Sequence, residues 1–390
     1  MPSLSAHMTA KALPAEGLLV GRAWNPAVDG PCIVKRAGDA LHDITSTFPT
    51  MRDLCEAEDP ASAARAASGE RLGSIDAIMA NTPPETRDAS KPWLLPPIDL
   101  QAVKAAGVTF ATSMLERVIE ERARGNPAAA AEIRATIGTL IGEDLSKLRA
   151  GSPQAMELKK VLIEKGAWSQ YLEVGIGPDA EIFTKSQVMS SVGHGMEAGL
   201  NPVSTWNNPE PEVVMVVAST GKIVGAMLGN DVNLRDVEGR SALLLGKAKD
   251  NNASCAVGPM IRLFDGSFSL DHVRRMQLSL KVEGEDGYVL NGASNMSKIS
   301  RDPADLVGQM IGPYHQYPDG AVLFLGTLFA PVEDRDAPGK GFTHKMGDVV
   351  TVSSPELGTL ANRMTTSDKA AAWTFGSSHL FRNLARRGLL

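Results

Sequence analysis

Along the first half of the chain, apolar residues recur every three or four positions within stretches rich in Ala, Glu and Arg. This period and this composition are typical of helices. Two short apolar runs, 17–24 and 31–38, come first and have the character of strands. Residues 81–99 hold five of the 24 prolines and are predicted to form an extended connector. The helices are expected in segments 51–68, 114–125, 126–150 and 152–166.

After about residue 170 the pattern changes to short apolar or alternating runs separated by Gly, Asp and Asn, which indicates strands. Residues 219–222 and 284–287 are expected to close two hairpins. One helix is predicted at 302–314, with Asp302 as its N-cap and Pro303 in its first turn. The strands are expected at 212–218, 223–230, 241–248, 276–282, 288–294, 321–329 and 348–354.

The pattern therefore predicts an α+β protein. A smaller mixed α/β N-terminal domain, 1–165, is followed by a mostly β domain, 166–390. With 43% hydrophobic and 22% charged residues in a chain of 390, either part is long enough to bury a core, and wholesale disorder is excluded.

Charge and cysteine content limit which binding partners and which cellular compartment are expected for this protein. A net charge of −6 argues against nucleic-acid binding, which needs clustered Lys and Arg. Cys32, Cys55 and Cys255 form no C-x-x-C pair, which favours a reducing cytoplasm over a disulfide framework or a zinc site. Residues 1–11 lack the pattern of a signal peptide, and no apolar run approaches the ~20 residues of a membrane span, so we expect no membrane partner.

Two carboxylates precede the strand at 212–218. On a strand, Glu210 and Glu212 would point to the same face, roughly 7 Å apart, with Pro211 tolerated at the strand start. Two ionised carboxylates side by side are unfavourable unless a cation lies between them or one is protonated, and Mg²⁺ prefers oxygen ligands. The hairpin through 219–222 would bring Asp231 to the same end of the neighbouring strand. The alternatives are a solvated acidic pair and an Asp231 that caps a turn.

Six stretches together resemble the fumarylacetoacetate hydrolase superfamily in order and spacing. The resemblance covers roughly residues 165–365 and implies a C-terminal domain of that family's type, a mixed β-sandwich roll. It implies Mg²⁺, with Mn²⁺ or Ca²⁺ as substitutes, on Glu210, Glu212 and Asp231. The stretches are "EPEVVMVV", "GNDVNLRD", "LLLGKAKD", "GPMI", "LFLGTLFAP" and "GDVVTVSSPELGTLANRM".

The same resemblance implies two further site motifs. The family's G-K motif matches Gly246–Lys247 and its G-T motif matches Gly326–Thr327, residues that bind or polarise substrate. A 2-oxo acid can chelate a divalent ion, and Lys247 beside it would act as acid, base or charge stabiliser. The structural alternatives are a surface lysine for Lys247 and an ordinary turn residue for Thr327.

Other stretches resemble the 2-keto-3-deoxy-pentonate dehydratases of this superfamily, in particular those acting on 2-keto-3-deoxy-D-xylonate. "VTFATSMLERVIEER" would supply Phe110 and Arg117 to the substrate, and "AEIFTKS" would place Glu181 and Lys185 near the metal. Lys185 is expected to contact substrate, and Glu181 is a candidate base. The alternatives are a core Phe110, an Arg117 that pairs within its helix, a strand-edge Glu181 and a structural Lys185.

One stretch favours a different reaction. "SSVGHGMEAG" resembles the element of the hydrolases in which a histidine activates water, which would make His194 catalytic in C–C bond cleavage of an acylpyruvate. Gln187 stands where those hydrolases carry a ligating Asp, and His194 between glycines could equally line a loop.

The interpretation is therefore an enzyme, a hydro-lyase that dehydrates 2-keto-3-deoxy-D-xylonate to 2,5-dioxopentanoate in oxidative pentose degradation. The alternatives are a C–C hydrolase and a non-catalytic 2-oxo-acid binding protein. The resemblance further implies an N-terminal domain that contributes a lid, and assembly as a homodimer or homotetramer.

Overall fold

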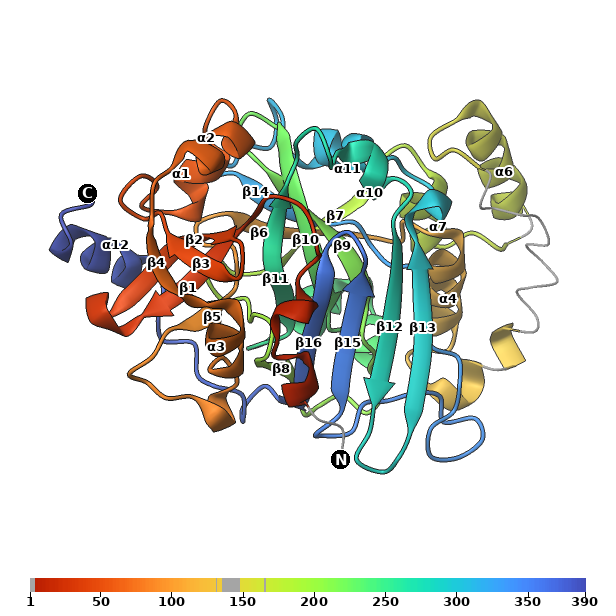
Figure 1. Cartoon of the computed structure of the whole chain (residues 1–390). Helices are drawn as coiled ribbons and strands as arrows, with labels where there is room; N and C mark the ends of the chain where they lie inside the picture. The colour runs from red at the N-terminus through yellow and green to blue at the C-terminus, as the bar shows by residue number, and fades with distance from the viewer. Residues whose placement is uncertain (1–3, 131, 135–147, 165) are drawn as a thin grey trace.

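The computed structural model describes residues 4–130, 132–134, 148–164 and 166–390, and in it two β-sheets pack face to face with helices around them (Figure 1). The mixed α+β architecture expected from the sequence is confirmed. Within the described residues the larger sheet has the order β4-β3-β2-β1-β11-β10-β9-β14-β6-β7, with β5 paired to β1. The smaller sheet has the order β13-β12-β15-β16-β8.

The strands of the larger sheet are mostly antiparallel, with β6 and β14 parallel. They are β1 (Leu19–Asn25), β2 (Gly30–Ala37), β3 (Ala40–Asp43), β4 (Glu70–Ser74), β5 (Trp93–Leu95), β6 (Ala102–Gly107), β7 (Glu181–Ser186), β9 (Pro211–Val217), β10 (Ile223–Asp231), β11 (Cys255–Leu263) and β14 (Ala321–Phe324). The smaller sheet contains β8 (Glu197–Leu200), β12 (Gln277–Glu283), β13 (Val289–Asn295), β15 (Val349–Ser354) and β16 (Gly358–Thr366).

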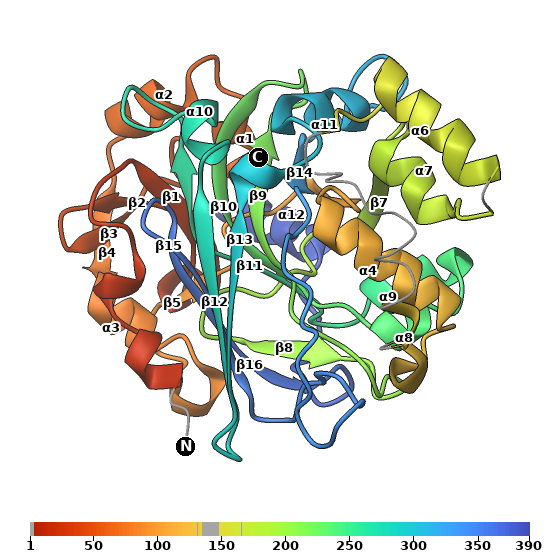
Figure 2. The same cartoon turned by 90° about the vertical axis from the view of Figure 1, so that its right-hand side faces the viewer.

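The helices lie at the edges and ends of the two sheets. They are α1 (Met51–Cys55), α2 (Pro60–Ala66), α3 (Ile75–Ala80), α4 (Ala111–Arg122), α6 (Pro153–Glu164), α7 (Gln170–Ile176), α8 (Arg235–Glu238), α9 (Leu245–Lys249), α10 (Leu270–Val273), α11 (Pro303–Met310) and α12 (Ser377–Arg386). In Figure 2, α4, α6, α7, α8 and α9 gather on one side of the molecule. Short 3₁₀ turns cover Leu4–His7, Ala10–Ala12, Pro26–Val28, Pro84–Thr86, Ala242–Leu244 and Met296–Lys298.

Strand β9 is the centre of the core. Val213, Met215 and Val217 pack into the hydrophobic cluster between the sheets, and Val214 and Val216 pack into a second cluster on the opposite face. Because both faces are covered, every position of the strand is buried, which explains its unbroken apolar run.

Most predicted elements are confirmed within a few residues. The 219–222 turn joins β9 to β10, and the 284–287 turn joins β12 to β13. Asp302 caps α11 by accepting a hydrogen bond from the amide of Ala304 at 2.9 Å. Most of the helix expected at 126–150 lies outside the described residues.

The prediction of a strand at 241–248 is wrong. Residues Ala242–Leu244 form a 3₁₀ turn that leads into α9, and the side chain of Ser241 caps it by accepting from the amide of Leu243. Leu243 is 96% exposed, so the apolar run does not mark a buried strand. A short apolar run does not distinguish a strand from a helical turn by periodicity alone.

The larger sheet draws strands from both sides of residue 165. Strand β1 pairs with β11, and β6 pairs with β14 and β7. The domain boundary at 165/166 stays a prediction, and the sheet is continuous across it. Helix α12, near the end of the chain, lies beside β2 near its beginning, where Asn383 donates to the carbonyl of Asp29 at 2.8 Å (Figure 1). Among the described helices, none has the length and apolar character needed to cross a membrane.

Candidate metal and active site

Three buried carboxylates meet where β9 begins and β10 ends. The hairpin pairs Glu212 with Gly229, and the amide of Asp231 donates to the carbonyl of Glu210 at 3.0 Å. One carboxylate oxygen from each of Glu210, Glu212 and Asp231 lies within 4.8 Å of the others. The structure thus brings together the three acids that the sequence selected, for the reason given there: the turn at 219–222 aligns the two strand ends.

Two of these carboxylates carry cationic partners. The Nζ of Lys249 lies 2.5 Å from Oε2 of Glu210 and 3.1 Å from Oδ2 of Asp231. The Nζ of Lys185 lies 2.8 Å from Oδ1 of Asp231, and Arg117 pairs with Oε1 of Glu210. Burial by itself would raise the pKa of Asp231, but Lys185 and Lys249 outweigh burial and lower it.

Glu212 has no such partner in the described part of the chain. Its Oε2 accepts a hydrogen bond from the amide of Gly326 at 2.6 Å. Burial, and then the charges of Asp231 and Glu210, raise the pKa of Glu212 well above its usual value. Glu212 is therefore the acid that gains most from a cation placed among the three.

The position predicted for Lys247 is wrong. Lys247 is exposed, whereas Lys249, two residues later, is 2% exposed and holds the contacts to Glu210 and Asp231. Residues two apart on a helix point to nearly opposite sides, and α9 therefore turns only one of the two lysines inward. Burial lowers the pKa of Lys249, but Asp231 and Glu210 more than compensate and raise it, so that the amine stays protonated.

Glu181, at the start of β7 opposite Gly107 of β6, does not line the cavity, but the charges of Lys249 and Glu210 act on it. A side chain at Gly107 would collide with the carboxylate of Glu181. Burial, and then the charge of Glu238, raise the pKa of Glu181 to about 7. A carboxylate that titrates near neutrality beside other ionisable groups is suited to acid–base chemistry.

Three acids hold the guanidinium of Arg117. Its Nη1 lies 2.6 Å from Oε2 of Glu120 and 3.2 Å from Oε2 of Glu238, and its Nη2 pairs with Glu210. Glu120 also receives the Nε of Arg235 at 2.7 Å, and the Arg235 guanidinium lies 4.3 Å from the ring of Trp206. This network fixes Arg117 against a proposed metal ligand.

Gly326 and Thr327 line the cavity beside the acids, as expected. Gly326 has φ of +85°, and a side chain there would collide with the hydroxyl of Thr109. Its amide binds Glu212. The hydroxyl of Thr327 accepts from the amide of Phe329 at 3.1 Å and retains a proton to donate.

Three other predicted site residues either lie away from the cavity or use their polar groups in contacts within the protein. Phe110 is fully buried in the core between the sheets and is absent from the cavity wall, so its structural alternative holds. Lys185 is fully buried, and besides Asp231 its amine donates to the carbonyl of Lys249 at 2.6 Å and that of Val232 at 3.2 Å, which makes it a support for Asp231.

His194 does not line the cavity. Its Nδ1 accepts from the amide of Ala361 at 3.1 Å, so its Nε2 carries the proton and donates to the carbonyl of His7 at 3.0 Å. Burial lowers the pKa of His194 to about 4, and the ring stays neutral. Both nitrogens are therefore used in the structure, which argues against His194 as an activator of water.

The cavity at the acids measures about 30 Å³, enough for an ion or a water molecule or two. Seven of its lining residues were not selected from the sequence: Ala106, Gly107, Val108, Ser113, Phe183, Glu238 and Lys249. Phe183 follows Glu181 by two positions on β7 and so projects to the same side, a signal that alternation on a strand could have given. Glu238 comes from α8 and carries no local signal.

The charges of this region leave a deficit of positive charge. Five cations, Arg117, Arg134, Lys185, Arg235 and Lys249, face six buried acids, Glu116, Glu120, Glu210, Glu212, Asp231 and Glu238. Six minus five leaves one negative charge among these described residues when all are ionised. A cation among the three carboxylates would offset that excess, and carboxylate oxygens are the donors that Mg²⁺ prefers.

Comparison with known proteins agrees with this geometry. Residues 206–365 match the family described as "Fumarylacetoacetate (FAA) hydrolase C-terminal". A 2-dehydro-3-deoxy-D-arabinonate dehydratase of Saccharolobus solfataricus is 33% identical over 183 residues, covering 46% of this chain and 57% of that protein. A probable 2-keto-3-deoxyxylonate dehydratase of Haloferax volcanii is 29% identical over 196 residues, covering 50% and 64%. The chain thus spans less than two thirds of either relative.

Solved structures share the fold over most of the chain. A 2-keto-3-deoxy-D-arabinonate dehydratase in its apo form superposes with a TM-score of 0.61 at 21% identity, covering 89% of this chain and 99% of that one. The same enzyme complexed with magnesium and 2,5-dioxopentanoate gives a TM-score of 0.60 at 20% identity over the same shares. The segment that matches the fumarylacetoacetate hydrolase C-terminal family contains all three acids and Lys249.

Proposed function

We propose that the protein is a hydro-lyase that removes water from a 2-keto-3-deoxy-pentonate, giving 2,5-dioxopentanoate, with Mg²⁺ as its cofactor. The observation that carries this proposal is the buried group of Glu210, Glu212 and Asp231 with Lys249 against it and Glu181 nearby. The dehydratases named above, one of them solved with magnesium and 2,5-dioxopentanoate, support the choice of reaction.

Glu210, Glu212 and Asp231 are the residues that would hold the metal. When bound, a divalent ion supplies Lewis acidity to the carboxylate and keto oxygens of a 2-oxo acid and so acidifies the neighbouring C3–H. Lys185 fixes Asp231 and Arg117 fixes Glu210, so that both carboxylates keep one orientation. We assign Arg117 this positioning role in addition to the substrate contact expected from the sequence.

Glu181 and Lys249 divide the proton transfers. Glu181, with its pKa near neutrality, takes the proton from C3. Lys249, held protonated by its carboxylate neighbours, gives a proton to the C4 hydroxyl, which leaves as water while the C3–C4 double bond forms. Loss of a proton from C5 and its return at C3 then give an enol, which ketonises to the aldehyde of 2,5-dioxopentanoate. Thr327 can donate its hydroxyl proton to a substrate oxygen.

The remaining choice of substrate is the configuration at C4. A 2-keto-3-deoxy-pentonate keeps only that stereocentre, so D-xylonate and D-arabinonate lead to one and the same compound. We propose the D form, since the sequence resembles the enzymes that act on 2-keto-3-deoxy-D-xylonate.

The test is to incubate the full chain and MgCl₂ with each C4 form of 2-keto-3-deoxy-pentonate and, separately, with an acylpyruvate, and to identify products by mass spectrometry. Loss of the mass of one water molecule from the D form is expected. Pyruvate from the acylpyruvate, with no change to the pentonates, would overturn the proposal in favour of a hydrolase. Binding of a pentonate by calorimetry without any product would favour the non-catalytic alternative.

We further propose that the protein works in the cytoplasm, as its three buried, unpaired cysteines suggest. Assembly as a homodimer or homotetramer stays a prediction.

A further inference from the structure

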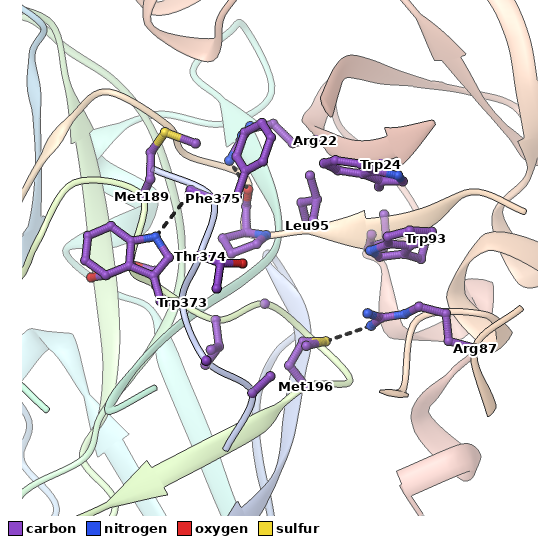
Figure 3. Close-up of a pocket in the computed structure, with 18 of the residues that line it drawn as sticks. Arg22, Trp24, Arg87, Trp93, Leu95, Met189, Met196, Trp373, Thr374 and Phe375 are labelled. Carbon is purple, nitrogen blue, oxygen red and sulfur yellow. Dashed lines mark hydrogen bonds between the residues drawn. The ribbon is translucent and has the colours of Figure 1, made fainter. Parts of the chain in front are cut away.

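A second cavity, of about 670 Å³, lies apart from the carboxylates and shares no lining residue with the first (Figure 3). Five separate parts of the chain line it: residues 22–29 with β1, residues 87–98 with β5, the segment 189–196 that follows β7, Asn252, and the segment 371–375 that precedes α12. Its volume is within the range of small-molecule sites, which is about 300–1,000 Å³. The proposed dehydration does not use it.

Aromatic rings form its walls. Trp24 of β1 and Trp93 of β5 are directly opposite each other in the strand register and stack with ring centroids 5.6 Å apart. Phe375 meets Trp24 edge to face at 5.4 Å. Trp373 faces this group from the other side in Figure 3, and its indole N–H donates to the carbonyl of Phe375 at 3.1 Å. Trp373 is 46% exposed, so its ring is open to a ligand.

One cation on the wall lacks a counter-charge. The guanidinium of Arg87 lies over the ring of Trp93, 4.8 Å from its centroid. Its hydrogen-bond acceptors are neutral: it donates to the thioether of Met196 at 3.1 Å and to the carbonyl of Thr82, while the charge of Glu85 acts on it from beyond ion-pair distance. No carboxylate of the described residues pairs with it within 4.0 Å, and Glu85 pairs instead with Arg363 at 3.7 Å.

The other charges on this cavity are already balanced. Arg22 lies 3.7 Å from Asp99 and donates to the carbonyl of Ile98 at 2.6 Å. Asp29 pairs with Arg386 at 3.7 Å. Arg87 therefore gives the cavity an excess of one positive charge, located on the stacked indole pair.

We propose that this cavity binds a small, planar aromatic or heteroaromatic carboxylate. The rings of Trp24 and Trp373 supply flat apolar surfaces against which a planar molecule can stack, and Trp93 supports Trp24 from behind. Arg87, held over the ring of Trp93, supplies a positive charge, and its Nη1, which makes neither of the hydrogen bonds given above, can donate to a carboxylate. The chemistry differs from that of the first site, where carboxylates would hold a hard cation and a flexible hydroxy acid.

The test uses 2-naphthoate as the probe, titrated into the full chain with MgCl₂ present and followed by isothermal calorimetry. Saturable binding at one site is expected. Two matched compounds separate the contributions: 2-naphthylmethanol keeps the rings without the charge, and cyclohexanecarboxylate keeps the charge without the aromatic plane. Each should bind at least about tenfold more weakly.

Two variants locate the site. Trp373→Leu and Arg87→Gln should each weaken 2-naphthoate binding at least about tenfold. Trp168→Leu and Arg275→Gln, which change the same residue types outside the cavity, should leave it unchanged. Thermal melting will show whether Arg87→Gln lowers the stability of the protein. Trp373 is exposed, so Trp373→Leu tests the site even in that case.

Three results would each overturn the inference. The first is the absence of saturable 2-naphthoate binding up to its solubility. The second is equal affinity for 2-naphthylmethanol, which removes the role of charge. The third is unchanged binding in Trp373→Leu. None of these bears on the dehydratase proposal, whose readout is product formed from the pentonate.

Discussion

The amide of Gly326 donates to Oε2 of Glu212 at 2.6 Å, and within the described chain this neutral donor replaces the cationic partners that Glu210 and Asp231 have. A backbone N–H orients the carboxylate without neutralising it. Glu212 is therefore the proposed metal ligand whose charge is least balanced by the protein.

Glu212→Gln should retain the hydrogen bond from Gly326 through its amide oxygen and lose the charge. We expect kcat to fall at least about 100-fold and Mg²⁺ affinity to drop, because one anionic oxygen leaves the metal site. Steady-state rates and calorimetric Mg²⁺ titration will measure both. Full turnover with metal bound would contradict the assignment.

Lys249→Met should lower kcat by about 100-fold or more, through loss of the proton donor. It should also destabilise the fold by about 3–5 kcal/mol in the absence of Mg²⁺, because Glu210 and Asp231 lose a buried partner. Lys247→Met is the matched control and should change stability by less than about 0.5 kcal/mol and leave the rate unaltered. If Lys247→Met has the larger effect on rate, the assignment of the inward lysine is wrong.

The pH dependence of kcat/KM should reflect the ionisation of Glu181. As the base, Glu181 must be ionised, and its pKa is raised to about 7. The value of kcat/KM should therefore rise with pH to a plateau above 7 and fall about tenfold per pH unit below it. In Glu181→Gln the rate should be low, and kcat/KM should no longer fall below pH 7. Glu157→Gln, at an exposed site of α6, should keep the native pH profile. A native-like limb in Glu181→Gln would assign the titration to another group.

Gly326→Ala should destabilise the protein by about 1–3 kcal/mol, because the backbone has positive φ and the new methyl group meets Thr109. Gly246→Ala, in α9 with open space around it, should stabilise by up to about 1 kcal/mol, as alanine favours a helix. Chemical denaturation of both variants tests this pair. Equal effects would show that the conformation at Gly326 is not restrictive.

His194→Gln should keep dehydration within about twofold of the native rate and cost about 1–3 kcal/mol of stability, because two buried hydrogen bonds are altered. Denaturation and product analysis measure the two effects separately. A rate loss of about 100-fold in a folded variant would restore a catalytic role for the histidine.

The group of three carboxylates was predictable because sequence features close together along the chain determine it. Two acids two positions apart precede a strand, a short turn follows, and a third acid ends the returning strand, so that strand geometry alone brings them together. Lys249 was not predictable in the same way. On the strand expected at 241–248, Lys247 and Lys249 would have pointed to one side, and only the observed helix separates them.

Long-range contacts account for the other differences. Glu238 reaches Arg117 across 121 positions, and nothing in either segment indicates the pairing. Phe110 precedes a helix in a stretch that resembles a substrate-binding element, but its burial in the core depends on distant contacts such as its bridge to Ile299. The aromatic cavity combines Trp24, Trp93 and Trp373, which no motif connects.

The pairing of β1 with β11 joins Leu19 to Arg262, and that of β6 with β14 joins Lys104 to Leu323. Strand β1 can pair early with β2, but a ribosome must synthesise most of the polypeptide before β1 meets β11 and β6 meets β14. Sheets closed by such distant partners acquire their order slowly, because a large loop entropy is lost before the contacts form. We expect newly made protein to depend on chaperones during this interval, with unpaired strand edges exposed until the last third of the sequence emerges.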